Sequence, residues 1–368
     1  MPIAADLCDL APSYVDAIAP YQPGKPISEL EREFGITGAV KLASNENPAG
    51  ASPLAIAAAQ AALLDVARYP DGNGFELKRA LAAHHGVAES TIVLGNGSND
   101  VLELAARTFL APGAAAVFAQ HAFAVYPLVT QAVGASGIEV PARDYGHDLP
   151  AMARAITDDV RVVFVANPNN PTGTFVSPRE VHAFLESVPS RVLVVLDEAY
   201  VEYLPDDLRT DSAAWLAEFP NLVVSHTFSK AHGLAGLRVG YGLAHPLVAD
   251  LMNRVRQPFN VSSVAQAAAV AALGDQAFVA ASRERNRLGM AQIVAGLEGL
   301  RLDFIPSYGN FVSFRVADAA GVYDRLLRLG VIVRPIASYG MPDFLRVSVG
   351  LPEENARFLA ALAQALGR

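Results

Sequence analysis

The sequence predicts an α/β fold: a large domain with a mostly parallel, mixed sheet flanked by helices, and a smaller α+β domain at the C-terminus. Two observations predict it. Continuous apolar runs of strand length, rich in β-branched residues, occupy positions 160–166 and 191–196, as in strands buried on both faces of a parallel sheet. Helical patterns alternate with such strands, which is typical of the α/β class. The chain of 368 residues is long enough for two sizeable cores.

The domain boundaries follow from changes in pattern along the chain. Residues 1–40 are rich in proline and lack a sustained period, so we expect an arm that wraps the body or a partner subunit. The large domain is expected over residues 41–255 and the small domain over 256–368, beginning with a long helix. The alanine-rich stretch 55–64 is too short to span a bilayer and is expected to be a packing helix.

Composition excludes several classes of partner. The formal net charge is -9 and there is no long basic run, which argues against nucleic acid or anionic membranes as partners. Cys8 is the single cysteine, so an intrachain disulfide is excluded and a reducing compartment is favoured. The first twenty residues contain no lysine or arginine, so the basic start of a secretory signal is missing. These features predict a cytoplasmic protein.

The first strand of interest, residues 91–94, runs into a glycine-rich loop and then into a helical pattern at 101–107. Gly95 and Gly97 would let the backbone approach an anion closely, and the amides around Ser98 and Asn99 would favour a phosphate at the helix N-terminus. The glycine spacing matches neither a P-loop nor a dinucleotide fingerprint. An ordinary helix cap at Ser98 or Asn99 explains the same residues.

Two further segments offer groups for a flat ring. Phe123 lies between the helix and the next strand and could stack on a heteroaromatic ring, or it could be a core residue. The strand at 160–166 runs into residues 167–173, a turn dense in proline, asparagine and glycine. Asn170 there offers an amide for a ring oxygen, while the prolines fix the shape of the loop.

The strand at 191–196 is followed by Asp197 and Tyr200. Ligands in open α/β sheets bind at the carboxyl ends of strands, where the Asp197 carboxylate could pair with a protonated pyridine nitrogen. Tyr200 could donate its hydroxyl to a phenolic oxygen of the same ring. A helix cap at Asp197 and core packing of Tyr200 are the alternatives.

Lys230 lies among small and hydroxylated residues. A lysine amine must lose its proton before it can attack a carbonyl, and a nearby cation such as Arg238 favours that loss. Thr227, Ser229 and Arg238 together could hold a dianionic phosphate. The pattern therefore predicts a lysine that forms a Schiff base with a phosphorylated aldehyde cofactor; a lysine in a surface loop is the alternative.

Two arginines near the C-terminus are candidates for binding an anionic substrate. Arg334 follows the predicted strand 331–333, and Arg346 lies inside the predicted strand 344–349. An arginine in an apolar strand needs an anionic partner, because burying an unpaired charge is costly. A substrate phosphate or carboxylate would supply one, and so would a structural salt bridge.

Taken in order, these segments resemble the fold-type I, pyridoxal-phosphate-dependent aminotransferases. Residues 41–48, 68–72 and 345–350 look like the histidinol-phosphate aminotransferase branch, and the resemblance spans roughly residues 15–365. Phe123 stands where the branch commonly has tyrosine, and Ser98 and Asn99 stand where it often has alanine and an acid. Neither change removes the proposed role, because stacking needs only an aromatic face and backbone amides meet the phosphate.

The resemblance implies pyridoxal 5'-phosphate as cofactor and a homodimer with shared active sites, in which Tyr69 reaches the cofactor phosphate of the other subunit. It implies that Arg334 and Arg346 face the substrate, that Tyr21 covers it, and that Asn47 is a further substrate contact. No metal is expected.

The reaction implied is transamination of L-histidinol phosphate with 2-oxoglutarate, giving imidazole acetol phosphate and L-glutamate in histidine biosynthesis. The alternatives are an aromatic amino-acid aminotransferase, a decarboxylase acting on an amino-acid phosphate, and a cofactor-binding regulatory module without turnover.

Overall fold

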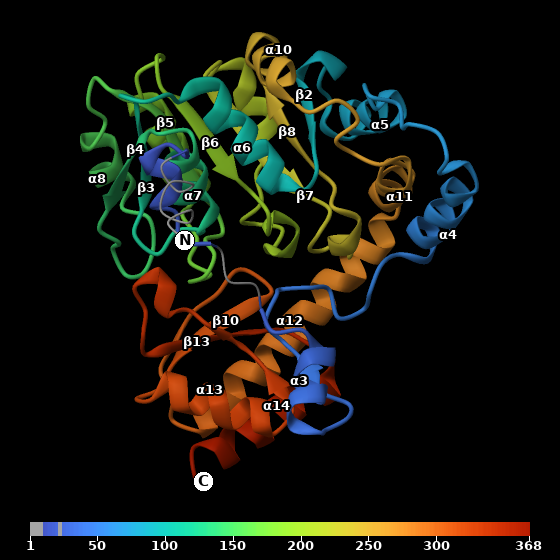
Figure 1. Ribbon diagram of the computed structural model, residues 1–368, viewed down its shortest axis with the longest axis vertical. Coiled ribbons are helices and arrows are strands. Elements are labelled where there is room, and N and C mark those ends of the chain that lie inside the picture. The colour runs from blue at the N-terminus through green and yellow to red at the C-terminus, as the bar shows by residue number, and fades with distance from the viewer. Residues whose placement is uncertain (1–9, 21–23) are drawn as a thin grey trace, which may run out of the picture.

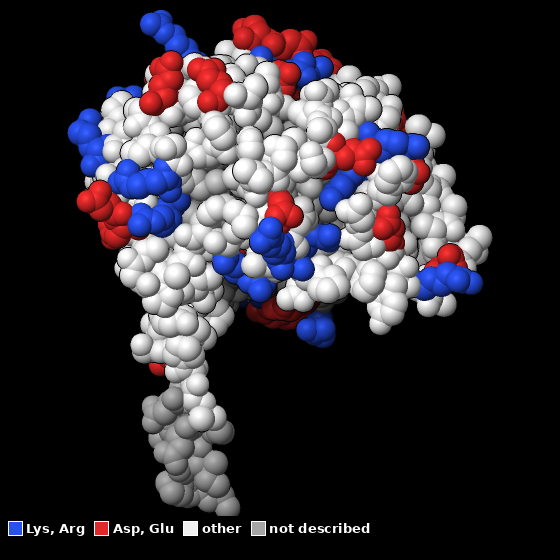
Figure 2. Space-filling model, turned by 90° about the horizontal axis from the view of Figure 1, so that it is seen from above, with Lys and Arg blue, Asp and Glu red and all other residues white. Residues whose placement is uncertain are grey.

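The computed structural model describes residues 10–20 and 24–368. A larger part with a central sheet and a smaller part are joined by the long helix α12 (Gln276–Gly299), as Figure 1 shows. The short helix α2 (Ser13–Asp16) lies against α7 (Val125–Ala132), where the Tyr14 carbonyl accepts a hydrogen bond from Gln131 at 3.1 Å. On the face shown in Figure 2, acidic and basic side chains are interspersed.

The central sheet has seven strands in the order β2-β8-β7-β6-β5-β3-β4. Their bounds are β2 Ile92–Gly95, β3 Ala115–Ala119, β4 Ser136–Val140, β5 Val160–Ala166, β6 Leu193–Asp197, β7 Leu222–Thr227 and β8 Gly240–Ala244. The neighbouring pairs from β7 to β4 are parallel, and β8 runs antiparallel to both of its neighbours. The prediction of a mostly parallel, mixed sheet is confirmed.

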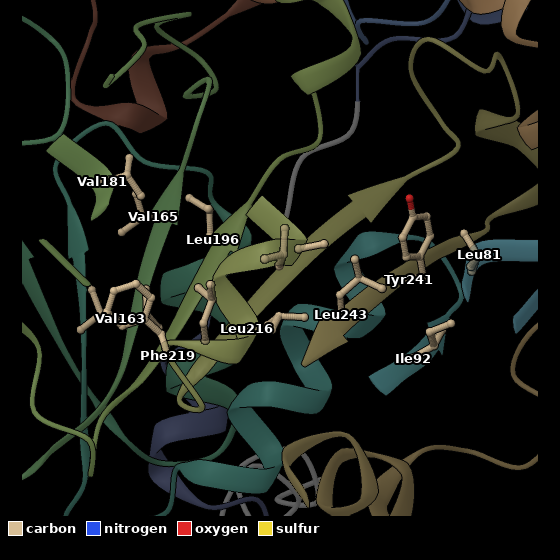
Figure 3. Close-up of a cluster of buried hydrophobic side chains, with 14 of the residues drawn as sticks. Leu81, Ile92, Val163, Val165, Val181, Leu196, Leu216, Phe219, Tyr241 and Leu243 are labelled. Carbon is tan, nitrogen blue, oxygen red and sulfur yellow. The ribbon is translucent and has the colours of Figure 1, made fainter. Parts of the chain in front are cut away.

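Helices cover both faces of this sheet. One face packs against α6 (Ser98–Phe109), α7 (Val125–Ala132) and α10 (Pro246–Val255). The other packs against α4 (Pro53–Ala62), α5 (Phe75–His85), α8 (Leu149–Arg154), α9 (Pro178–Ser187) and α11 (Ser263–Gly274). Each face of the sheet has its own hydrophobic core. Along β5, Val162 and Phe164 pack into the core with α6, α7 and α10. Val163 and Val165 pack into the core on the other face, which Figure 3 shows. Burial on both faces is why the strands read as continuous apolar runs.

The smaller part contains a four-stranded antiparallel sheet in the order β12-β13-β10-β9. The strands of this sheet are β9 Phe304–Ile305, β10 Phe311–Arg315, β12 Arg334–Pro335 and β13 Phe344–Ser348. The helices of the smaller part are α12, α13 (Ala319–Arg328) and α14 (Pro352–Ala365). The predicted strand at 331–333 is divided: β11 (Val331–Ile332) pairs with β1 (Val40–Lys41), and Arg334 belongs to β12. Short 3₁₀ helices lie at Leu63–Asp65, Glu89–Thr91, Val201–Tyr203, Ser212–Ala217, Ala235–Leu237 and Ala337–Tyr339.

Packing divides the chain differently from the predicted boundaries. The predicted arm contains α3 (Ile27–Phe34), whose Leu30 packs with Leu327 and Ile332 of the smaller part. Helix α11 follows residue 255 but belongs to the large core, where it packs closely against α4. The long helix that enters the smaller part is α12, which begins only at Gln276. We therefore propose that the smaller domain begins at α12 and also takes in residues 27–41.

In the described part of the chain, no single helix is both long and apolar enough to cross a membrane; α11 and α12 meet that description only as a pair bent by 78°.

Candidate active site

A cavity lies at the carboxyl ends of β5, β6 and β7, where the large sheet faces the smaller part. It brings together most of the residues predicted for the site, namely Ser98, Asn99, Phe123, Asn170, Asp197, Tyr200, Thr227, Ser229, Lys230, Arg238, Arg334 and Arg346. Asn170, Asp197 and Lys230 meet here because the parallel strands β5, β6 and β7 end at the same edge of the sheet. Arg334 and Arg346 come from the antiparallel pair β12 and β13 of the smaller part.

Asp197 is the last residue of β6 and is 4 % exposed. Its Oδ2 accepts a hydrogen bond from the Tyr126 hydroxyl at 2.9 Å, while its Oδ1 is buried and has no hydrogen-bond partner among the described residues. Burial raises the pKa of Asp197 to about 6, although the hydrogen bond from Tyr126, the backbone N–H of Ala199 and the charge of Lys230 oppose that shift. A buried acceptor of this kind suits a cationic N–H donor, because an unpaired buried carboxylate oxygen is costly.

Lys230 lies just beyond β7 and is largely enclosed by the cavity wall. Its Nζ donates to the Ser44 carbonyl at 3.3 Å. Burial lowers the pKa of Lys230 to about 8, and the positive charges of Arg346 and Arg238 act in the same direction. The free amine is therefore accessible near neutral pH, as a nucleophile requires.

Tyr200 and Asn170 are fixed by partners from distant parts of the chain. The Asn45 amide donates to the Tyr200 hydroxyl at 2.9 Å, and burial raises the pKa of Tyr200. Arg346 donates through Nη1 to Asn170 Oδ1. Both side chains line the cavity beside Asp197, which places hydrogen-bonding groups along one side of it.

An anion cradle lies at the start of α6. Ser98 is the first helical residue and makes no side-chain cap, so the ordinary helix cap considered above is wrong and Gly97 takes the cap position. Gly97 has a φ of 82°, and a Cβ there would collide with the Arg238 guanidinium. Arg238 Nη1 donates to Ser229 Oγ at 3.3 Å. Helix amides, an arginine and a hydroxyl thus converge, as phosphate binding requires.

The two C-terminal arginines lie directly opposite each other in the antiparallel pair β12 and β13. Arg346 is 5 % exposed, donates to the Ala43 carbonyl at 2.8 Å and lies over the Phe311 ring, with 5.2 Å from its guanidinium carbon to the ring centre. Arg334 lines the same cavity. Two guanidinium groups at one end of a cavity favour a phosphate or carboxylate there.

Of the other predicted residues, two do not line this cavity and one lies outside the described residues. Asn47 is not at the cavity wall, because its side-chain amide donates to the Ala231 carbonyl and to Ser282 Oγ, each at 2.9 Å; the assignment of Asn47 as a substrate contact is corrected on this ground. Tyr69 is 83 % exposed and stacks on Phe259, with ring centres 4.9 Å apart. Tyr21 lies outside the described residues.

Sequence reasoning missed several wall and supporting residues. Asn45 and Glu46 line the cavity instead of Asn47, within the same 41–48 segment that carried the resemblance. Tyr339 lines it from the smaller part, where no motif marked it. Tyr126 is in α7, and Phe123 lies just before that helix; nothing in the sequence marked the contact between the two rings.

Comparison with known proteins places this geometry in a family. The sequence pattern of the family "Aminotransferase class I and II" matches residues 37–362. The chain belongs to this family. Histidinol-phosphate aminotransferase of Methylobacillus flagellatus is 64 % identical over 362 residues, covering 98 % of each chain. A histidinol-phosphate aminotransferase of Pseudomonas fluorescens is 58 % identical over 369 residues, covering 100 % of each.

Solved structures show the same arrangement. The crystal structure of histidinol-phosphate aminotransferase from Sinorhizobium meliloti in complex with pyridoxal-5'-phosphate superposes with a TM-score of 0.89 at 30 % identity, covering 96 % of each chain. A double mutant of Thermus thermophilus aspartate aminotransferase superposes with a TM-score of 0.84 at 24 % identity, covering 96 % of this chain and 99 % of that one. At 24 % identity, the comparison with aspartate aminotransferase shows a shared fold and nothing more. The predicted fold-type I architecture is confirmed.

Proposed function

We propose that the chain is a pyridoxal-phosphate-dependent histidinol-phosphate aminotransferase, which exchanges an amino group between L-histidinol phosphate and 2-oxoglutarate and yields imidazole acetol phosphate and L-glutamate. The observation that carries the proposal is the buried Asp197 Oδ1, which has no hydrogen-bond partner among the described residues, in the same cavity as Lys230 and three arginines. Relatives with that name, 58 % and 64 % identical over almost the whole chain, support the substrate. A cytoplasmic location in histidine biosynthesis is part of the proposal.

The residues fit the cofactor. Asp197 Oδ1 would accept the ring N–H, and the face of Phe123 would meet the ring. Tyr200 and Asn170 would hydrogen-bond the ring oxygen. The phosphate would be held by Thr227, Ser229, Arg238 and the amides of Ser98 and Asn99. When bound, the cofactor supplies an aldehyde for covalent attachment and a ring that withdraws electrons from the reacting carbon.

Lys230 would act twice. Its amine would hold the cofactor covalently until the amino donor takes its place. The freed amine would then move the proton from the amine-bearing carbon of the donor to the former aldehyde carbon of the cofactor. In the second half-reaction Lys230 would move a proton from that cofactor carbon to the carbon of the oxo acid that receives the amino group. Its lowered pKa, about 8, suits both directions of proton movement.

Arg334 and Arg346 would bind the far end of the substrate. The phosphate of histidinol phosphate and the distal carboxylate of 2-oxoglutarate are both anions, so one arginine pair could serve both half-reactions. A bidentate guanidinium suits either group.

The lowered pKa of Lys230 also predicts how the rate of cofactor attachment depends on pH. Because the Lys230 pKa is lowered to about 8, the fraction of nucleophilic amine increases as pH rises through that value. We expect the rate at which the apoenzyme attaches pyridoxal phosphate to rise between pH 7 and pH 9 and then level off, as stopped-flow absorbance would show. A rate still climbing at pH 10 would indicate a lysine with the ordinary pKa of about 10.4.

The function is tested by anaerobic absorbance titration of the cofactor-loaded protein with L-histidinol phosphate and, in parallel, with L-phenylalanine. Conversion of the bound cofactor to its amine form at low histidinol phosphate is expected. Conversion only by phenylalanine would move the assignment to an aromatic amino-acid aminotransferase, and release of carbon dioxide from an amino-acid phosphate would identify a decarboxylase.

A homodimer with shared sites is part of the proposal. Tyr69 lies outside its own cavity and is highly exposed, as a residue that serves a partner would be. Large apolar side chains from α4 and the following turn are exposed as well, namely Leu54, Ile56, Leu63, Leu64 and Val66. An exposed apolar group of this size is typical of an interface.

Subunit mixing tests this arrangement. Tyr69→Ala and Lys230→Ala should each be defective as homodimers, but a mixed dimer carries both lesions in one site and neither in the other. Dissociating and reassociating equal amounts should therefore restore about a quarter of wild-type activity. Mixing Asp197→Asn with Lys230→Ala is the matched control, because each mixed dimer then has a lesion in both sites. Equal recovery in the two mixtures, or none in the first, would contradict the cross-subunit role.

A further inference from the structure

Tyr126 is buried beside the cavity, and among the described residues its side chain makes one hydrogen bond. It is 0 % exposed, and its hydroxyl donates to Asp197 Oδ2 at 2.9 Å. Burial, with the nearby Asp197 charge, raises the pKa of Tyr126 far above its ordinary value. The hydroxyl therefore keeps its proton and is a permanent donor to the carboxylate.

The ring that carries this hydroxyl is fixed on two sides. It stacks on Phe164 of β5 with ring centres 4.9 Å apart and 5° between the planes. Phe123 meets it edge to face, with centres 5.9 Å apart and 86° between the planes. In the sheet, Ala166 at the end of β5 is opposite Asp197 at the end of β6. Tyr126 thus reaches from the face of β5 to the carboxylate at the end of the neighbouring strand.

We infer that Tyr126 is a positioning residue: its hydroxyl occupies one oxygen of Asp197 and turns the other oxygen toward the cavity, and its ring sets the orientation of Phe123. The two residues proposed to hold the cofactor ring, Asp197 and Phe123, are then oriented by one side chain. This inference rests on the proposed cofactor.

The hydroxyl also affects the charge of Asp197. A hydrogen bond to a carboxylate favours the ionised form, and the Tyr126 bond opposes the upward shift in the pKa of Asp197 that burial causes. Without the hydroxyl, Asp197 would be protonated up to a higher pH. A protonated Asp197 has no negative charge to pair with a cationic ring N–H. The loss of cofactor affinity in a variant without the hydroxyl should therefore be largest at low pH.

The test is the dissociation constant of pyridoxal phosphate from the apoenzyme, measured by equilibrium dialysis from pH 5.5 to 8.5 in wild type and Tyr126→Phe. We expect binding in Tyr126→Phe to weaken by about 10- to 100-fold, the range for a hydrogen bond to a charged group, and the acid limit of binding to move to higher pH. Tyr203→Phe is the matched control, because Tyr203 is also buried but accepts only a long contact, 3.5 Å, from Asn310.

A cofactor analogue with CH in place of the ring nitrogen separates positioning from general packing. Tyr126→Phe should bind this analogue nearly as wild type does, since Asp197 then has no ring N–H to meet. Equal losses for cofactor and analogue, or a Tyr126→Phe binding curve that matches Tyr203→Phe, would overturn the inference. Failure of the wild-type apoenzyme to bind pyridoxal phosphate would instead overturn the proposed function. Far-ultraviolet circular dichroism of each variant would exclude loss of the fold.

Discussion

Replacing Lys230 with alanine is expected to abolish transamination almost entirely, lowering turnover by several orders of magnitude with the fold intact. The variant loses the covalent attachment point and the base, and general acid–base catalysis alone contributes about 10²- to 10⁴-fold. The fold should persist because, within the described residues, the hydrogen bond that Lys230 Nζ donates is a long one, 3.3 Å to the Ser44 carbonyl. Single-turnover absorbance and thermal unfolding of the same preparation would measure both effects.

Two further variants sharpen this test. Lys230→Arg keeps the positive charge but cannot lose its proton, so it should be as inactive as Lys230→Ala if the amine is nucleophile and base. Lys78→Ala is the matched control, since Lys78 is also buried but donates to Asn73 Oδ1 at 3.0 Å and does not line the cavity. Near-normal turnover in either Lys230 variant would contradict the assignment.

The parts of the site that a strand delivers by itself could be predicted from the sequence. Asp197 and Asn170 each follow a continuous apolar run, and the rule that ligands bind at the carboxyl ends of parallel strands needs no knowledge of the partners. Lys230 and Arg238 belong to one short segment in the same way. For these residues the local sequence is enough to predict that they lie at the ligand-binding edge of the sheet.

Residues whose place depends on tertiary partners could not be predicted in the same way. Asn47 lies in the right segment, but its amide donates to Ala231 and Ser282, while Asn45 two residues earlier lines the cavity and donates to Tyr200. Tyr126 looks like an ordinary core aromatic until Asp197 is seen 2.9 Å away.

The domain boundary that we propose differs from the predicted one for a related reason. The break at residues 256–260 marks the end of α10, but it does not show where α11 packs. The buried face of α11 consists largely of alanines, including Ala265, Ala268 and Ala272, and it lies against the alanine-rich α4. Small side chains allow close helix contact whichever domain they belong to, so their pattern alone could not assign α11 to the large core.

Replacing Arg346 with glutamine is expected to lower kcat/KM for histidinol phosphate by about two to four orders of magnitude. Arg346 would supply two charge-assisted contacts to the substrate anion, each about 1.5–3 kcal/mol. It also fixes Asn170 and contributes to the lowered pKa of Lys230. The remaining activity should therefore rise with pH through a higher midpoint than in wild type, because the Lys230 pKa moves upward when a neighbouring cation is removed.

Comparing histidinol phosphate with unphosphorylated histidinol distinguishes anion binding from support of the fold. If Arg346 binds the phosphate, Arg346→Gln should lose far more activity toward histidinol phosphate than toward histidinol, and Arg346→Lys should recover part of the difference, since it keeps the charge but not the bidentate fork. Arg315→Gln is the matched control: Arg315 lies on the neighbouring strand β10, but it is exposed and pairs with Asp343. An equal loss toward both substrates would mean that Arg346 acts through Asn170 and the Ala43 carbonyl, with no direct contact to the substrate.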